Sequence, residues 1–165
     1  MKVPKRRRRE GKTDYKLRIG LLKSEKPRIV FRKTNRYVIG QCVKSKNAQD
    51  YTVLGVNSKD LLDYGWPAER TGSLKSLPAC YLSGLLLGKK ILKKEKEKEF
   101  IFDIGMLRHV YKSKIYAFLK GVKDAGVNVN AKAEVFPDEK RLKGEHTKVK
   151  EIFDRVKEKI EEEKS

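Results

Sequence analysis

The spacing of hydrophobic residues changes along the chain and divides it into segments of different structure. Residues 1–14 contain no regular apolar spacing, so they lack the side chains for a core and are expected to be a disordered arm that orders on a partner. Between Tyr15 and Ser24 the apolar positions fit a short helix that crosses the surface. The pattern therefore predicts an N-terminal region without a core of its own.

Three strand-like runs follow the arm. They are residues 28–32, 37–43 and 51–56, each rich in β-branched or aromatic side chains. The polar residues 33–36 are expected to form a hairpin turn, and the polar residues 44–50 a loop. Three strands in series with short connections predict an antiparallel meander.

The middle of the chain predicts a loop, a helix and a further strand. Residues 57–76 are polar and contain glycine and proline, which is typical of a loop or insertion. Ser76 is a candidate N-cap and Pro78 fits the first turn, so a helix is predicted from residue 79 to about residue 97, buried in its first half and basic and solvated in its second. The nearly continuous apolar run 100–104 is typical of a central strand covered on both faces.

Two more helices are expected after this strand. Residues 106–112 form a loop, and residues 127–130 alternate in the manner of a short strand. The helix between them is predicted from Ile115, Phe118, Leu119 and Val122, with Gly126 at its C-terminal end. The last helix is predicted from the apolar stripe Val149, Ile152, Phe153, Val156 and Ile160.

The predicted fold class is α/β, with a mixed sheet and the element order βββαβα. The helix between the third and fourth strands supplies a crossover, so the fourth strand is expected to lie parallel to a neighbour. We divide the chain into a basic arm at residues 1–26, an α/β core domain at 27–130, and a C-terminal extension with an amphipathic helix at 131–165.

Charge is distributed unevenly over this plan. The formal net charge of the 165 residues is +19. Residues 1–36 hold 15 Lys or Arg and 3 Asp or Glu, a net charge of +12, which leaves only +7 for the remaining 129 residues. Self-repulsion of this size disfavours a compact free state, so an acidic polymer is the natural partner.

Membrane attachment and thiol chemistry find little support. The longest uncharged stretch after the N-terminal third, residues 76–88, is too short to span a bilayer. The basic cluster is not followed by the apolar segment of a secretory signal, and it has no glycine for myristoylation. Cys42 and Cys80 lie in apolar surroundings without CxxC or Cys/His spacing, so both are expected to be buried thiols in a reducing compartment.

Catalytic motifs are weak as well. Residues 84–90 resemble a phosphate-binding loop, but the segment is one residue short and lies inside a predicted helix, so core packing explains it better. His109 and His146 have no partner at metal-ligand spacing. Asp103 is the only acid in the predicted central strand, and a two-metal nuclease needs several carboxylates. We therefore expect no catalysis, no metal and no cofactor.

The candidate chemistry is a set of cationic side chains interleaved with aromatic and amide groups. Arginine presents a planar fork that matches phosphate oxygens, and a helix N-terminus also favours phosphate. The arm contributes Lys5, Arg6, Arg7, Arg8, Arg9, Lys12, Tyr15 and Arg18. The hairpin turn and its flanks contribute Arg32, Lys33, Asn35, Arg36 and Tyr37. The loop before the helix at residue 115 contributes Arg108, His109, Tyr111, Lys112 and Lys114. For the hairpin and loop groups, ordinary solvated charge is the alternative.

Several segments, taken in order, match one known family. They are RIVFRKTNRYVI at 28–39, YGW at 64–66, PACYLSGLL at 78–86, FDIG at 102–105, YKSKIYA at 111–117 and FPDEKRLKGEH at 136–146. Together they resemble the large-subunit ribosomal protein eighteen family, whose members bind 5S rRNA. The segments at 64–66, 78–86 and 136–146 are similar to its archaeal and eukaryotic branch.

The resemblance implies a ribonuclease-H-like topology without activity, in a protein of the cytoplasmic ribosome. The implied partners are 5S rRNA, 23S rRNA and neighbouring large-subunit ribosomal proteins in the central protuberance, with no membrane and no small-molecule substrate. Carried over by motif, the RNA-binding residues are the three groups above. Ser113 stands where bacterial relatives have a glycine. The helix after residue 148 has no counterpart in the short bacterial form, so it covers either a neighbouring protein or the core.

Two other functions are alternatives for the same charge pattern. One is a metal-dependent nuclease on a ribonuclease-H-like fold that uses Asp103, and the other is an RNA chaperone that acts outside the ribosome.

Overall fold

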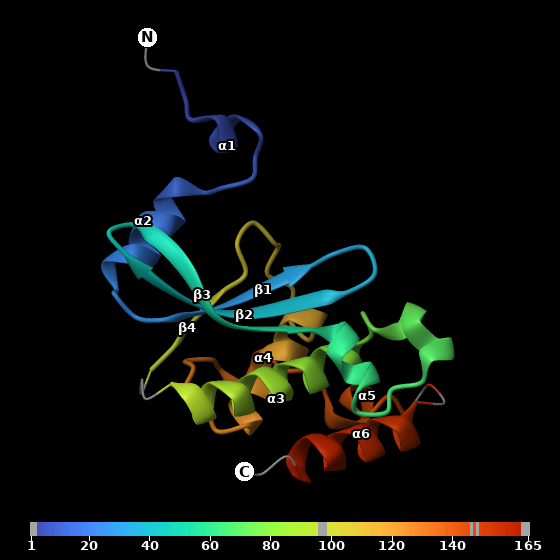
Figure 1. Ribbon diagram of the computed structural model, residues 1–165. Helices are drawn as coiled ribbons and strands as arrows, with labels where there is room; N and C mark the ends of the chain where they lie inside the picture. Colours follow the sequence, from blue (N-terminus) through green and yellow to red (C-terminus); the bar gives the residue numbers. More distant parts are fainter. Residues whose placement is uncertain (1–2, 96–98, 146, 148, 163–165) are drawn as a thin grey trace.

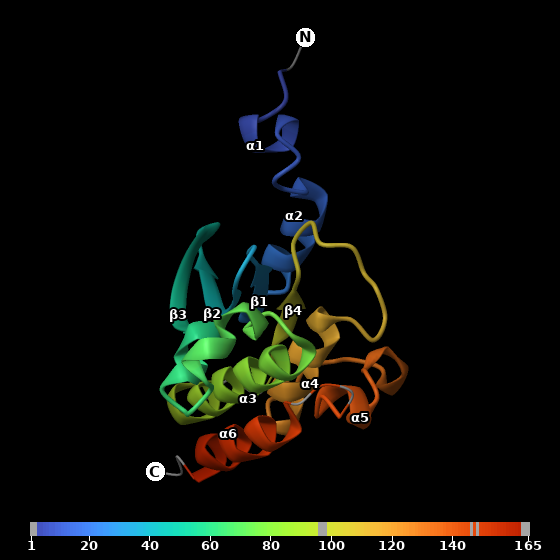
Figure 2. The same ribbon diagram turned by 90° about the vertical axis from the view of Figure 1, so that its right-hand side faces the viewer.

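In the computed structural model, which describes residues 3–95, 99–145, 147 and 149–162, a four-stranded sheet packs on a layer of two helices. These helices are α3 (Leu77–Lys94) and α4 (Lys114–Asp124), and a further helix, α6 (Lys150–Glu162), lies on their other side (Figure 1). The basic N-terminal segment extends away from the sheet at the opposite end of the molecule from α6 (Figure 2).

The strands are β1 (Arg28–Lys33), β2 (Val38–Lys46), β3 (Gln49–Asn57) and β4 (Ile101–Asp103). Their order in the sheet is β3-β2-β1-β4, with β1 antiparallel to β2, β2 antiparallel to β3, and β4 parallel to β1. The α/β class, the mixed sheet, the order βββαβα and the parallel fourth strand are therefore confirmed.

The prediction that residues 100–104 form a central strand was wrong. β4 has only three residues and lies at the edge of the four-stranded sheet, and Ile101 and Phe102 are only partly buried. In the described residues, the predicted strand at 127–130 is reduced to one isolated bridge between Phe100 and Val129. The apolar run has another cause, because its two end residues, Phe100 and Ile104, both enter the core.

The polar residues 44–50 are a hairpin instead of the predicted loop. β2 and β3 continue to Lys46 and Gln49, and the turn consists of Asn47 and Ala48 with φ values of 52° and 61°. Two left-handed residues give a turn whose twist matches that of the flanking strands. The polar composition hid these strand ends because residues 45–52 are exposed and carry no apolar alternation.

Residues 57–76 also hold more structure than a loop. Two short 3₁₀ helices, η1 (Ser58–Leu62) and η2 (Ala68–Ser73), cover one end of the core. Leu61, Trp66 and Leu74 are buried there. Their spacing fits neither an α-helix nor a strand, so the pattern gave no signal.

The beginning of α3 is as predicted. The Ser76 hydroxyl accepts a hydrogen bond from the Ala79 amide at 3.4 Å, and Pro78 lies in the first turn. The helix is buried as far as Gly88 and again at Ile91, and it ends at Lys94, short of the predicted residue 97; residues 96–98 lie outside the described chain.

The segment that resembles a phosphate-binding loop is helix packing, as predicted. A Cβ atom at Gly84 would lie 2.1 Å from the Phe118 carbonyl oxygen, and one at Gly121 would lie 2.1 Å from that of Tyr81. The backbones of α3 and α4 approach so closely that only glycine fits at these two positions.

The C-terminal helix α6 covers the core, which is one of the two roles predicted for it. Phe153, Val156 and Ile160 are buried, and the Phe153 ring lies 5.6 Å from that of Tyr81 on α3. The stripe predicted from the sequence is thus the buried face of α6. Residues of this segment belong to the same hydrophobic cluster as the sheet.

The arm contains two helices, α1 (Arg6–Arg9) and α2 (Tyr15–Lys23), neither of which has a buried residue. The Asp14 carboxylate caps α2 by accepting hydrogen bonds from the Lys16 and Leu17 amides at 2.8 and 3.2 Å. The helix predicted near residues 15–24 is confirmed. One helical turn also stands within the segment expected to be disordered.

The remaining helices are η3 (Ala133–Val135) and α5 (Glu139–Leu142), which lie in the polar stretch before α6. Leu142 enters the core, so this stretch is held against the domain.

Candidate nucleic-acid interface

The arm presents its cationic side chains to solvent. Arg6, Arg7, Arg8 and Arg9 are all exposed on one helical turn, as are Lys5 and Lys12. Local contacts hold some of them in place: the Lys5 ammonium lies 4.9 Å from the centre of the Tyr15 ring, and the Arg7 Nε donates to the Thr13 hydroxyl at 2.9 Å. The arm therefore offers phosphate a dense row of guanidinium groups without burying any of them.

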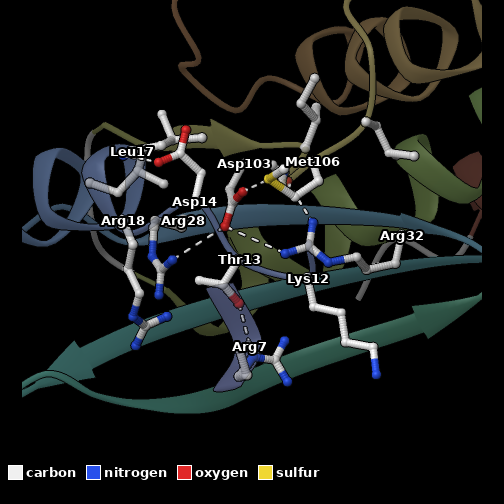
Figure 3. Close-up of a pocket in the computed structure, with 14 residues that line it drawn as sticks. Arg7, Lys12, Thr13, Asp14, Leu17, Arg18, Arg28, Arg32, Asp103 and Met106 are labelled. Carbon is white, nitrogen blue, oxygen red and sulfur yellow. Dashed lines mark hydrogen bonds and ion pairs between the residues drawn. The ribbon is translucent and has the colours of Figure 1, made fainter. Parts of the chain in front are cut away.

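Arg18 and Arg32 are paired with carboxylates of the sheet, whereas Arg6 and Lys12 pair with Glu10 inside the arm, at 3.7 and 2.9 Å. Arg18 Nη1 lies 2.8 Å from Asp50, and Arg32 Nη2 lies 3.6 Å from Asp103. Arg28 connects the two carboxylates, at 2.7 Å from Asp50 and 3.2 Å from Asp103 (Figure 3 shows its pair with Asp103). The five side chains form an ion-pair network that joins α2, β3, β1 and β4.

Arg28 is the buried centre of these ion pairs, and the sequence pattern did not single it out. Its side chain is 4% exposed and that of Asp103 is 7% exposed. Alternation along β1 provides the signal that could have found it: Ile29 and Phe31 enter the core beneath the sheet, so Arg28 points to the other face. A buried cation needs an anionic partner, and Asp103 is the acid on the adjacent strand.

The ion pairs fix the charge of Asp50. Burial acts to raise the pKa of its carboxyl, but hydrogen bonds from Arg18, Ser45 and Arg28, together with the charge of Arg28, outweigh burial and lower the pKa to about 2. Asp50 is thus ionised near neutral pH. Through Arg18 it anchors α2 on the hairpin.

A cavity of about 350 Å³ opens between the arm and the sheet. Arg7 and Lys12 from the arm line it together with Arg32 from β1, and Met106 and Leu107 line it from the loop after β4 (Figure 3). The structure therefore brings the arm group and one member of the hairpin group to the same hollow.

The hairpin turn itself is an exposed tip. Lys33, Asn35 and Arg36 are solvent-exposed, and the turn is closed by the Thr34 amide and hydroxyl, which both donate to the Tyr37 carbonyl at 2.9 Å. The Lys59 ammonium lies over the Tyr37 ring, 4.7 Å from its centre, in a cation–π contact. Asn35, Arg36 and Tyr37 do not line the cavity next to the arm.

The loop before α4 is held by aromatic contacts at its base. His109 Nδ1 and the Tyr116 hydroxyl lie 3.1 Å apart, and the Tyr111 ring meets the Tyr116 ring edge-on at 6.2 Å between centres. Tyr111 remains 66% exposed and Arg108 is also exposed. An aromatic ring held at one edge and open to solvent is suited to stacking on an unpaired base.

Lys112 and Lys114 complete the loop group. Lys112 has a left-handed backbone, with φ at 56°, and its ammonium lies 3.1 Å from Asp138. The strained position is therefore Lys112, one residue before Ser113, where bacterial relatives were expected to carry glycine. Lys114 is partly buried at the first position of α4.

A second cavity joins the loop group to the hairpin. Lys33 lines it with Arg108, Lys112 and Lys114, and Leu107 lines both this cavity and the one beside the arm. Members of all three predicted groups thus meet at two neighbouring hollows. His109 and Tyr111 are exposed beside them without lining either.

Other kinds of site find no support where the structure describes the chain. No three His, Cys, Asp or Glu side chains gather there as a metal site, and no described helix is long and apolar enough to cross a membrane. Cys42 and Cys80 are free and buried as predicted, and burial raises the pKa of Cys42 to about 11 and that of Cys80 to about 12. His146 lies outside the described residues.

Comparisons with known proteins all match ribosomal proteins of the large subunit. The family model described as ribosomal large subunit proteins 60S L5 and 50S L18 matches residues 1–101. A large ribosomal subunit protein uL18 from Korarchaeum cryptofilum is 49% identical over 145 residues, which cover 88% of this chain and 72% of the relative. A protein of the same name from Methanothrix thermoacetophila is 47% identical over 144 residues, covering 87% of this chain and 82% of the relative.

Proposed function

Because this chain belongs to the family of ribosomal large subunit proteins 60S L5 and 50S L18, we propose that it binds 5S rRNA and helps attach it to 23S rRNA in the central protuberance. Membership of the family makes the protein a structural, non-enzymatic component of the large ribosomal subunit, with rRNA and other ribosomal proteins as its partners. The identity of the RNA and the residues that bind it are the subject of the proposal.

One observation carries the proposal: cationic residues from three separate parts of the chain line two adjoining cavities. Arg7 and Lys12 from the arm, Lys33 from the hairpin and Arg108 from the loop all contribute, and Leu107 borders both hollows. Charges placed only for solubility would have no reason to converge in this way. A folded polyanion with an irregular surface fits the arrangement better than a straight duplex.

The two kinds of cation have different tasks. The exposed guanidinium groups of the arm neutralise phosphates, which supplies affinity without sequence preference. The hairpin tip and the loop before α4 have fixed shapes, and they select the fold of the RNA through its backbone and its unstacked bases. Arg18 and Arg32 act by positioning, because their guanidinium groups are engaged by Asp50 and Asp103.

The geometry disfavours the nuclease alternative. Asp103, its candidate carboxylate, lies 3.2 Å from Arg28 and 3.6 Å from Arg32. Two guanidinium groups at these distances neutralise the charge that a catalytic metal would need. The role of Asp103 is to hold β1 and β4 together.

The test is direct binding of the full chain to 5S rRNA, to a 23S rRNA fragment from the central protuberance, and to an unrelated structured RNA of equal length. We expect preferential binding to the first two. If roughly 6–10 phosphates are engaged, the affinity falls by roughly 10³–10⁵-fold between 50 and 200 mM salt. Equal affinity for all three RNAs, or an affinity that ignores salt, contradicts the proposal. Co-sedimentation with the large subunit at moderate salt separates it from the chaperone alternative.

A further inference from the structure

The cavity between the hairpin and the loop before α4 has features that phosphate binding alone does not explain. Its volume is about 450 Å³, within the range of small-molecule sites in proteins. The segments around it are distant in sequence: the end of β1, the start of α3, residues 107–115, and α5 in the C-terminal segment. A hollow of this size is much larger than one phosphate group.

The residues that line this cavity are of two kinds. Five are apolar: Phe31, Leu77, Leu107, Val110 and Ile115. Five are cationic: Lys33, Arg108, Lys112, Lys114 and Arg141. None of the described residues that line the cavity is acidic. The occupant must therefore combine an apolar face with a negative charge.

A polar atom without a partner lies at the same place. Ser113 lines the cavity, and its hydroxyl oxygen is buried and has no hydrogen-bond partner among the described residues. Ser113 is also the N-cap of the 11-residue helix α4, yet its side chain caps no amide of that helix. An unsatisfied buried hydroxyl is costly, so we expect a water molecule or a polar group of the cavity's occupant to pair with it. The positive end of α4 favours a partner that is an anion.

We infer that the cavity binds one unstacked nucleotide of the rRNA, with the base against its apolar lining residues and a neighbouring phosphate at its cationic ones. The inference rests on the proposed function, because it takes rRNA as the partner. A base supplies the flat apolar face, and its phosphate supplies the negative charge for the cations that line the cavity, of which Lys112 is already paired with Asp138. Splayed-out bases are what proteins select when they recognise folded RNA.

The inference assigns a role to Arg141, which no sequence pattern singled out. Arg141 lies on α5, is solvent-exposed, and meets the other cavity residues only through the tertiary fold. The adjacent Lys140 is also cationic and exposed but does not line the cavity. Lys140 therefore provides a matched control, of equal charge and on the same helix.

The first experiment measures the affinity of the full chain for 5S rRNA and for the 23S fragment in Arg141→Ala and Lys140→Ala variants. Loss of a charge-assisted contact in the cavity weakens binding of one of these RNAs about tenfold or more in Arg141→Ala, and less than twofold in Lys140→Ala. Both side chains are exposed, so the thermal midpoint serves as the check that the variants are folded. The competing occupant is an apolar side chain of a neighbouring protein. In that case Arg141→Ala binds both RNAs like the wild type, which overturns the inference.

The second experiment tests, without rRNA, whether the apolar residues of the cavity contact a nucleotide. Adenosine monophosphate and inorganic phosphate are titrated separately into the full chain, and the methyl resonances of Leu77, Leu107 and Ile115 are followed by NMR. We expect the nucleotide to shift these methyl groups and phosphate to leave them in place. Unshifted methyl groups, or equal shifts with both probes, overturn the inference. A wild-type chain that binds neither rRNA overturns the proposed function instead, and the titration still decides the cavity by itself.

Discussion

The two ends of the described chain are both rich in charge, but only one of them belongs to the core. α6 buries Phe153, Val156 and Ile160 against the helical layer, whereas α1 and α2 of the arm bury nothing. Leu17 and Ile19 of α2 are 45% and 54% exposed. The difference lies in the spacing of the apolar residues, since α6 repeats them at three and four positions and α2 does not form such a stripe.

The two ends are expected to affect different properties of the protein. The C-terminal segment contributes buried area, so its loss should lower the stability of the whole domain. The arm contributes exposed charge, so its loss should lower the affinity for RNA. Each of the following changes tests one side of this division, in order of decreasing expected effect.

The largest effect is expected from Phe153→Ala. The substitution removes a buried ring that lies 5.6 Å from the Tyr81 ring, and it leaves a cavity between α3 and α6. Truncation of a buried Phe costs about 3–5 kcal/mol, which lowers the thermal midpoint of a domain of this size by roughly 10 °C. Thermal unfolding followed by circular dichroism measures it. A midpoint within about 2 °C of the wild type would show that α6 is not part of the cooperative unit.

Deletion of residues 1–14 should have the opposite profile. The deletion removes seven Lys or Arg and leaves every buried residue in place. We expect the affinity for 5S rRNA to fall about 100-fold and the salt dependence to become shallower, because fewer counterions are released. The thermal midpoint should stay the same. If the midpoint falls as far as in Phe153→Ala, the arm is structural and the division between the two ends is wrong.

The part of the fold that follows from local pattern could be predicted from the sequence. Ser76 and Pro78 marked the start of α3, the spacing of Ile115, Phe118 and Val122 marked α4, and the stripe through Phe153 marked α6. In each case one face of a helix enters the core, and the repeat of the buried residues is the repeat of the helix. These elements were therefore visible without any knowledge of their neighbours.

The elements that were missed depend on partners elsewhere in the chain. The run at 100–104 reads as a central strand, yet the position of β4 at the sheet edge is a property of strand order. Trp66 and Leu74 enter the core from the residues that flank the short 3₁₀ helix η2, where the chain has no long apolar repeat. The ends of β2 and β3 beyond the core are exposed on both faces, so they lack alternation.

The candidate site divides in the same way. The exposed cations of the arm are evident from composition, because the arginines at 6–9 lie in a segment without the apolar residues that could bury them. The sequence counts Arg18 and Arg32 as equal to these, but the fold pairs them with Asp50 and Asp103. Arg141 enters the picture only when α5 folds against the loop before α4. Charge can be counted in a sequence, while availability of charge is a tertiary property.

Two glycine substitutions compare the tightness of packing in the core helix α3 with that in the arm helix α2. Gly84→Ala places a Cβ 2.1 Å from the Phe118 carbonyl oxygen, so α3 and α4 must move apart, at a cost of about 1–3 kcal/mol or more. Gly20→Ala lies within α2 of the arm, where a Cβ would meet nothing within 4 Å, and it favours the helix by about 0.5–1 kcal/mol. Denaturant unfolding should therefore show a lower midpoint for Gly84→Ala and none of this loss for Gly20→Ala. Equal losses in the two variants would mean that the arm is packed as tightly as the core.

The smallest effect is expected from the ion pair that connects the arm to the sheet, between Arg18 of α2 and Asp50 of β3. The pKa of Asp50 is lowered to about 2, below its ordinary value near 3.8, so its contribution to stability is present above about pH 4 and is lost as the pH falls from about 4 towards 2. Asp50 is partly exposed, and solvent screening reduces this contribution to about 1 kcal/mol.

The measurement compares the unfolding free energy of the wild type with that of Asp50→Asn at pH 6 and at pH 2.5, with exposed Asp63→Asn as the control. Other carboxylates titrate in all three proteins, so the difference between variants isolates Asp50. We expect Asp50→Asn to be less stable than the wild type by about 1 kcal/mol at pH 6. This gap should shrink at pH 2.5, because the Asp50 carboxyl of the unfolded chain, with its ordinary pKa near 3.8, binds a proton there and the folded state, with its pKa of about 2, mostly does not, which favours unfolding. A gap that stays constant with pH would mean that Asp50 acts by packing and by neutral hydrogen bonds, and that the arm is not held to the sheet by charge.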